Sequence, residues 1–288
     1  MKIKEFKIKK SSLMSWSEIF QNPRDLTLDS IKTGTVNINR RGTINPEHPG
    51  AGYIGDEVLT VPIMSHLVHH GELGNFLLDA GLDKLYSYDS YGGIKGEFAD
   101  EFFQEKNENI KFQVDIRNIY LNGVFLSHFH ADHIAGIREL PKNILYLIGK
   151  GEIEQYQPEI YGKFLKGVET IYEVDFSKLR EISPLGRCAD ILGDGSILAV
   201  STPGHTPGHI SYLLNGLNGP IFLTMDACFI QDNLKLKIAP SDYTWDIKMA
   251  QKTLDKIIEF SEDYPDVMML CGHECPKYSR FINRAFII

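Results

Sequence analysis

The amino-acid sequence predicts an α/β (or α+β) fold in which helices cover β-sheets. Five short apolar runs bounded by Gly, Pro or Asn have the pattern of buried strands. Segments with helical periodicity lie between them, and strands that alternate with helices are typical of this fold class. Each run also ends close to a polar residue able to bind metal, which predicts that these side chains meet at one rim of the sheets.

The five expected strands are defined by their apolar residues and by the polar residue that follows. They are Phe76–Leu78 before Asp79, Val124–Leu126 before His128, Ile197–Val200 before His205, Ile221–Leu223 before Asp226, and Val267–Leu270 before His273. The dipeptides Asp194-Gly195 and Asn218-Gly219 are typical of tight turns and precede two of these strands. The strand and turn signals therefore agree.

The clearest helix is expected from Trp245 to Phe260, where apolar residues from Ile247 onward recur on one face and Thr244 or Asp242 could cap the start. The lysine-rich beginning predicts a solvent-facing edge strand, and residues 37–52 read as a loop. We expect a single domain over residues 1–288, with residues 1–50 as an N-terminal extension and the motifs within 75–275.

Composition excludes several classes of protein. A net charge of −8 argues against a nucleic-acid partner, because phosphate binding requires a concentrated basic surface. No apolar run approaches the roughly 18 to 20 residues of a membrane span, and the charged start is not expected to be a secretory signal. Four cysteines among 288 residues are too few for a disulfide scaffold. We expect a cytoplasmic protein without a membrane partner; dimerisation through the first 50 residues stays open.

The segment from His128 to His133 holds three histidines and one aspartate in six positions, a pattern expected by chance in roughly one such sequence in a thousand. Residues i and i+2 at the end of a strand project the same way, so His128 and His130 can bind one ion together. Asp132 and His133 follow as the chain turns and can reach a second ion. Imidazole with carboxylate suits Zn²⁺, and also Fe, Mn or Co.

Further candidate ligands follow three later strands. His205 lies in a Pro/Gly-rich loop and is expected as the third ligand of the first ion, whereas His209 in the same loop is expected to support a neighbour. Asp226 could bridge both ions, and His273 could complete the second. Cys271 and Cys275 are a single CxxxC pair, which is a weak zinc signal, and both are expected to be buried thiols.

These motifs resemble the metallo-β-lactamase superfamily: HxHxDH, then TPGHTPGH, a strand-end Asp and GHE, preceded by FLLDAG. The resemblance implies a four-layer αββα sandwich with two mixed β-sheets and a dinuclear metal site in the cleft between them. It implies one ion held by His128, His130 and His205. It implies a second ion held by Asp132, His133 and His273. Asp226 would bridge the two ions, and Asp79 would support the metal-binding loop.

Within the superfamily the sequence is most similar to the N-acyl-homoserine lactonase branch. The long segment Leu82–Tyr120 before the HxHxDH strand and the phrase around Asp226 carry this likeness. That branch has a tyrosine three residues after the bridging aspartate, whose hydroxyl helps to hold the substrate carbonyl. Here Phe229 takes its place and cannot donate a hydrogen bond. Tyr243 is a candidate replacement.

Charge counting supports hydrolysis of a carbonyl ester. Two divalent ions, Asp132, Asp226 and a hydroxide leave a net charge of about +1, which favours a developing oxyanion. A metal-bridging hydroxide would attack the carbonyl carbon, and Asp226 would carry a proton to the leaving group. The expected substrate is a small ester, lactone or thioester, and a lactone of the N-acyl-homoserine type is favoured. Aromatic residues in the two long insertions could line an acyl-chain channel: Tyr86, Tyr88, Tyr91, Phe98, Phe102, Phe103, Tyr156, Tyr161 and Phe164.

Several alternatives remain. A thioester hydrolase of the glyoxalase-II type fits the TPGHTPGH and GHE motifs, although that branch reads Gly-Asp-Thr where this chain reads Met225-Asp226-Ala227. A small-molecule phosphodiesterase would need no extended basic track. Diiron redox chemistry is disfavoured because that branch carries Glu in place of His130, and an inactive metal-binding scaffold is disfavoured by the full set of seven candidate ligands.

Overall fold

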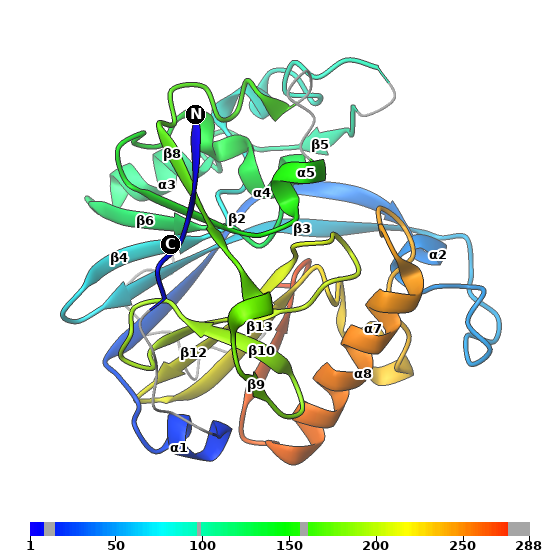
Figure 1. Ribbon diagram of the computed structural model, residues 1–288. Coiled ribbons are helices and arrows are strands. Elements are labelled where there is room, and N and C mark those ends of the chain that lie inside the picture. The colour runs from blue at the N-terminus through cyan, green and yellow to red at the C-terminus, as the bar shows by residue number, and fades with distance from the viewer. Residues whose placement is uncertain (9–14, 97–98, 156–160, 276–288) are drawn as a thin grey trace.

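The protein is described by a computed structural model covering residues 1–8, 15–96, 99–155 and 161–275. Its described strands form an eight-stranded sheet in the order β1-β8-β7-β6-β4-β3-β2-β5 and a six-stranded sheet in the order β14-β13-β12-β11-β10-β9. Both sheets mix parallel and antiparallel pairs: β4 and β6 are parallel, as are β13 and β14, whereas β2 and β3 are antiparallel. Figure 1 shows helices on the outer sides of the two sheets.

The first sheet is built from residues in the first two thirds of the chain. Its strands are β1 (Lys2–Glu5), β2 (Leu26–Asn39), β3 (Val58–His70), β4 (Gly74–Leu78), β5 (Phe102–Phe103), β6 (Leu121–Phe125), β7 (Leu145–Gly149) and β8 (Thr170–Val174). The helices and 3₁₀ turns among them are α1 (Trp16–Phe20), α2 (Arg40–Thr43), η1 (Lys84–Ser87), α3 (Ile110–Ile116), α4 (Ala131–Ile134), η2 (Ala135–Arg138) and α5 (Glu152–Gln155).

The second sheet is built from residues 181 to 271. Its strands are β9 (Glu181–Ile182), β10 (Gly186–Asp190), β11 (Ile197–Ser201), β12 (Ile210–Gly216), β13 (Gly219–Met225) and β14 (Met268–Cys271). The accompanying helical segments are η3 (Phe176–Lys178), α7 (Gln231–Leu236) and α8 (Ile247–Asp263). The five strands expected from apolar runs are therefore all present, as β4, β6, β11, β13 and β14.

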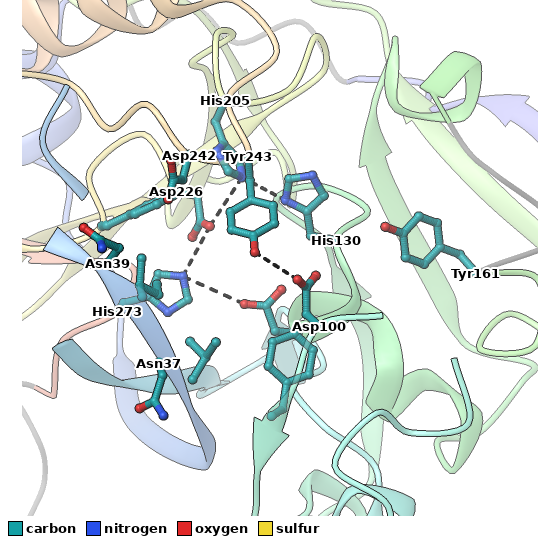
Figure 2. A pocket seen from close by; sticks show the side chains of 15 residues that line it. Asn37, Asn39, Asp100, His130, Tyr161, His205, Asp226, Asp242, Tyr243 and His273 are labelled. Carbon is teal, nitrogen blue, oxygen red and sulfur yellow. Dashed lines mark hydrogen bonds and ion pairs between the residues drawn. The ribbon is translucent and has the colours of Figure 1, made fainter. Parts of the chain in front are cut away.

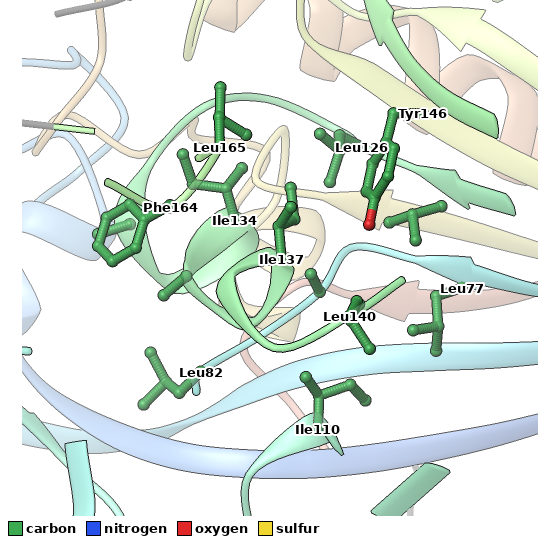
Figure 3. Packing of buried hydrophobic residues seen from close by; sticks show 14 of the residues in the cluster. Leu77, Leu82, Ile110, Leu126, Ile134, Ile137, Leu140, Tyr146, Phe164 and Leu165 are labelled. Carbon is green, nitrogen blue, oxygen red and sulfur yellow. The ribbon is translucent and has the colours of Figure 1, made fainter. Parts of the chain in front are cut away.

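Three buried apolar clusters define four layers. The middle cluster joins Leu78 and Phe125 of the first sheet to Ile221 and Leu223 of the second. Because side chains alternate along a strand, the neighbouring Leu77 points to the opposite face, where it packs with α4 and η2 (Figure 3). The third cluster packs α1 and α8 on the outer face of the second sheet. The expected αββα sandwich with two mixed sheets is thus confirmed.

Strand β2 was not expected from the sequence. Residues 37–39, read as loop, form its end, and residues 40–43 form a short helix. Polar residues alternate with buried Leu26 and Leu28 along β2, and the strand pairs with β3 over almost its whole length. The chain's first 50 residues thus contribute β1, the expected edge strand, as well as α1 and an internal strand.

Two local expectations were also wrong. Helix α8 begins at Ile247, and its N-cap is Asp246, whose side chain accepts a hydrogen bond from the Met249 N–H; Ile247 is exposed rather than part of the packed face. Cys275 is exposed, whereas Cys271 is buried as expected. All four cysteines are free thiols. No helix among the described segments has the length and hydropathy required to cross a membrane.

Candidate metal centre

Side chains from the ends of five strands and the loops after them converge on one rim of the sandwich. Parallel strands β4 and β6 deliver Asp79 and the segment 128–133, and parallel strands β13 and β14 deliver Asp226 and His273. His205 comes from the loop between β11 and β12. All of these residues are buried or nearly so, His130 being the most accessible of the candidate ligands.

Three imidazole nitrogens form the first group. His205 Nε2 lies 3.1 Å from His128 Nε2 and 3.0 Å from His130 Nδ1, and the latter two nitrogens are 3.0 Å apart. Burial lowers the pKa of His128 and His205 well below the ordinary histidine value, so both rings carry lone pairs at neutral pH. Three convergent nitrogens that cannot all donate to one another are a suitable donor set for a divalent cation.

The second group contains Asp132, His133 and His273. One donor atom from each lies within 4.8 Å of the other two. Although burial alone would lower the pKa of His133, the carboxylates of Asp132, Asp226 and Asp79 raise it well above its ordinary value. Burial would also lower the pKa of His273, but the carboxylates of Asp226 and Asp132 raise it above its ordinary value. This group therefore holds positive charge as a proton where a divalent cation could carry it instead.

Asp226 lies between the two groups. Its Oδ2 is 3.4 Å from Nε2 of His205 and of His273, and 3.5 Å from Nε2 of His133. Its Oδ1 is buried and has no hydrogen-bond partner. Burial would raise the pKa of Asp226, but His133 and His273 hold it well below its usual range. An ionised, partly unpartnered carboxylate facing both groups fits a bridging ligand, so the donor set accommodates two cations.

Asp79 orients the loop that carries residues 128–133 through its hydrogen bonds. Its carboxylate accepts hydrogen bonds from the Ser127 backbone N–H (2.6 Å), the Ser127 hydroxyl (2.7 Å) and His133 Nδ1–H (2.7 Å). Because His133 keeps a proton on Nδ1 for this bond, Nε2 is the nitrogen that faces the site and would bind an ion in place of its own proton. Similarly, His273 Nδ1–H donates to the Pro62 carbonyl at 3.0 Å, which turns Nε2 inward.

Replacing Asp79 with Asn is expected to weaken metal affinity by about 10- to 100-fold, because the amide cannot accept all three hydrogen bonds. Competition with a chromophoric chelator would measure the affinity. Asp190→Asn is the matched control: Asp190 is also buried, and accepts two backbone N–H bonds from Gly193 and Gly195 away from this site. Equal affinities for the two variants would contradict the orienting role.

His209 also lies behind the candidate ligands rather than among them. The Asp226 backbone N–H donates to His209 Nε2 at 3.1 Å, so the His209 proton is on Nδ1, which lies 2.8 Å from Thr202 Oγ1. His209 Nε2 thus accepts the Asp226 N–H, and His209 Nδ1–H donates to the Thr202 hydroxyl oxygen. The histidine loop and the strand that carries Asp226 are connected in this way.

Glu152 is a site residue that the sequence did not indicate. It begins α5, is almost fully buried, and accepts hydrogen bonds from the Gly208 N–H (2.8 Å) and the Phe129 N–H (3.1 Å). One carboxylate therefore joins the loop of His128 and His130 to the loop of His205. Burial raises the pKa of Glu152 to about 7. No motif marks it; the only signal is an acidic residue just after an apolar strand.

A cavity of about 530 Å³ opens above the two groups, within the range of roughly 300–1,000 Å³ typical of small-molecule sites. Figure 2 shows His130, His205, Asp226 and His273 pointing into it. The remaining lining residues are Val36, Asn37, Ile38, Asn39, Asp100, Phe102, Asp132, Tyr161, Phe229, Asp242 and Tyr243. Of the aromatic residues expected over the cleft, Phe102 and Tyr161 line it. Tyr86 and Phe164 are buried in the core instead, Tyr88, Tyr91 and Phe103 are exposed outside its lining, and Phe98 and Tyr156 lie outside the described residues.

Phe229 and Tyr243 both line this cavity. The Phe229 ring packs edge-on against His205 and His273, with ring centroids 5.4 and 5.3 Å apart, and so forms an apolar wall beside the ligands. Tyr243 lies near His130, at 6.3 Å between ring centroids, and its hydroxyl donates to Asp100 Oδ1 at 2.9 Å (Figure 2). The Tyr243 proton is therefore engaged by Asp100 rather than free for a substrate carbonyl.

A four-layer sandwich with these two donor groups at its rim defines a metal-dependent hydrolase. The chain belongs to the metallo-β-lactamase superfamily, whose sequence pattern matches residues 58–273. N-acyl homoserine lactonase AttM from Agrobacterium fabrum is 25% identical over 280 residues, which cover 89% of this chain and 96% of that protein. Hydroxyacylglutathione hydrolase from Hahella chejuensis is 27% identical over 157 residues, covering 54% of this chain and 49% of that protein.

Solved structures give the same fold. An N-acyl homoserine lactone hydrolase with the product N-hexanoyl-L-homoserine at its catalytic metal centre superposes with a TM-score of 0.67 at 17% identity, covering 87% of this chain and 94% of that chain. The dizinc quorum-quenching lactonase AidC superposes with a TM-score of 0.56 at 17% identity, covering 92% and 90%. The expected resemblance to the superfamily and its lactonases is confirmed.

Proposed function

We propose that this chain is a dinuclear lactonase that opens rings of the N-acyl-homoserine-lactone type. The observation that carries the proposal is the convergence of seven donor side chains, two groups of three with Asp226 between them, at the floor of a cavity of small-molecule size. The similarity to AttM over nearly the whole of both chains supports the lactone as substrate. We assign His128, His130 and His205 to the first ion.

The second ion is assigned to Asp132, His133 and His273, with Asp226 shared between the two. Nitrogen and oxygen ligands of this kind favour Zn²⁺. When bound, such ions supply a nucleophile at neutral pH and positive charge for the developing oxyanion. We assign Asp226 as the proton carrier, because its carboxylate lines the cavity between the two groups and can accept a proton from the attacking water and release it to the ring oxygen as the ester bond breaks.

A side-by-side assay tests this proposal. Zinc-loaded protein would be given an N-acyl-homoserine lactone, an S-acyl glutathione and a phosphodiester, and kcat/KM measured for each. We expect the lactone to be hydrolysed at least tenfold better than the others, with about two zinc ions per chain. A higher kcat/KM for the thioester would reject the lactonase in favour of a glyoxalase-II-like enzyme, and a higher value for the diester would favour a phosphodiesterase.

Replacing Phe229 with Tyr is expected to raise kcat/KM for homoserine-lactone rings by about tenfold. The phenol would add a donor directed at the developing oxyanion beside His205 and His273, where the present ring offers none. Phe102→Tyr places a hydroxyl on another part of the same cavity wall and serves as the control. An unchanged Phe229→Tyr variant, together with efficient thioester turnover by the wild type, would count against the lactone as substrate.

A further inference from the structure

The part of the cavity beyond the candidate ligands combines acidic side chains with apolar ones, the latter being Val36, Ile38, Phe102 and Phe229. Asp100 and Asp242 contribute carboxylates and Tyr161 contributes a phenol, whereas the amide oxygens of Asn37 and Asn39 accept hydrogen bonds from the Thr60 hydroxyl and the Arg41 N–H. No lysine or arginine is among the described residues that line it. Such a lining provides hydrogen-bond acceptors and negative charge but no cation to receive a carboxylate or a phosphate.

The two carboxylates are held by different parts of the chain. Asp100 comes from the segment before β5 and receives the Tyr243 hydroxyl proton at 2.9 Å, as Figure 2 shows. Asp242 packs on α2: the N–H groups of Ser241 and Asp242 donate to the Gly42 carbonyl at 2.9 and 3.1 Å. A Cβ at Gly42 would lie 1.8 Å from Asp242 Oδ2, so glycine is required for this close approach.

Neither Asp100 nor Asp242 forms an ion pair with a Lys, Arg or His side chain among the described residues. Burial raises the pKa of both groups, as expected for acids without a neutralising neighbour. Two metal ions would make the floor of the cavity positive, whereas its outer wall stays negative. A substrate with its carbonyl on the floor therefore places its distal substituent near the carboxylates of Asp100 and Asp242.

We propose that Asp100 and Asp242 select substrates whose acyl substituent ends in a hydrogen-bond donor, an ammonium or a hydroxyl, and discriminate against those ending in a carboxylate. This inference rests on the proposed lactonase function for the bond that is broken. It concerns which acyl groups the cavity accepts, and the candidate metal ligands do not determine this property. Anionic acyl donors such as glutathione thioesters would be poor substrates for the same reason.

The test is a set of N-acyl-homoserine lactones of equal chain length that end in ammonium, hydroxyl, methyl or carboxylate. For zinc-loaded full-length protein we expect kcat/KM to decrease in that order, with about a 100-fold ratio between ammonium and carboxylate at low salt. Asp100→Asn and Asp242→Asn should each reduce this ratio about tenfold, because each removes one charge near the substituent. Raising the salt to 1 M should reduce it in the wild type.

Asp115→Asn is the matched control, since Asp115 is an exposed acid on α3 that pairs with Lys111 outside the cavity; its ratio should equal that of the wild type. An equal kcat/KM for all four lactones, or an unchanged ratio in both Asp100→Asn and Asp242→Asn, would overturn the inference while leaving the lactonase intact. If no lactone is cleaved but a thioester is, the lactonase proposal fails, and the same four end groups on a thioester then test the selectivity separately.

Discussion

Asp226→Ala is expected to lower lactone or ester turnover by at least about 1,000-fold, which corresponds to about 4 kcal/mol of transition-state stabilisation. Asp226 Oδ2 faces Nε2 of His133, His205 and His273, and no other described carboxylate lies between the two donor groups. Alanine would remove the shared ligand and the proposed proton carrier together. Bound zinc should fall from about two ions per chain to one or fewer, measured by elemental analysis after dialysis.

Asp226→Asn separates the two roles of this side chain. The amide keeps the shape and one oxygen but loses the negative charge, so we expect metal content between those of wild type and Asp226→Ala, with turnover still strongly reduced. Asp190→Asn, the buried control away from the site, should keep both zinc ions and wild-type turnover per folded molecule. Full activity in Asp226→Ala would reject Asp226 as the shared ligand.

The second large effect is expected from Gly272→Ala, beside His273. A Cβ at this position would lie 2.7 Å from Asp226 Oδ1 and 2.7 Å from the Met225 carbonyl oxygen, both closer than van der Waals contact allows. The carboxylate or the β13 backbone must therefore move. We expect turnover to fall by about 100-fold, and overpacking to lower the free energy of unfolding by roughly 1–3 kcal/mol.

Gly216→Ala is the control for Gly272→Ala. Gly216 ends β12, and its added Cβ would meet its nearest neighbour, Leu26 Cβ, at 3.6 Å, which is ordinary contact. Thermal unfolding, zinc content and kcat would be compared for the two variants. Indistinguishable results would mean that the Asp226 carboxylate can be displaced without loss, contrary to the tight placement inferred for it.

The regular elements nearest the site were predictable because their signals are local. Apolar runs such as Ile221–Leu223 alternate between two buried faces, and this period-2 pattern is present in any short stretch of sequence. Strand β2 could not be recognised in the same way. Its polar residues between Leu26 and Asn39 are acceptable because β3 pairs with it almost throughout, and that pairing joins residues up to 44 positions apart.

Glu152 and Asp100 illustrate what local signals omit. Glu152 is important because the N–H groups of Phe129 and Gly208, which lie on two different loops, both donate to it. Asp100 belongs to an insertion without clear periodicity, lines the cavity, and accepts a hydrogen bond there from Tyr243, which is 143 residues away. Tyr243 was only a candidate donor from the sequence, and its partner Asp100 shows where its proton goes.

The sequence by itself determined the strand-end motifs, and with them the identity and order of seven candidate ligands, because residue type and short-range spacing set which side chains can leave one strand end together. Tertiary structure alone decided that Asp226 faces His133, His205 and His273, that Glu152 joins two loops, and that Asp100 and Asp242 stand in the outer cavity wall. These features depend on distances between segments far apart in the chain. Such distances are set by the packing of two sheets against each other, which no local pattern of residues specifies.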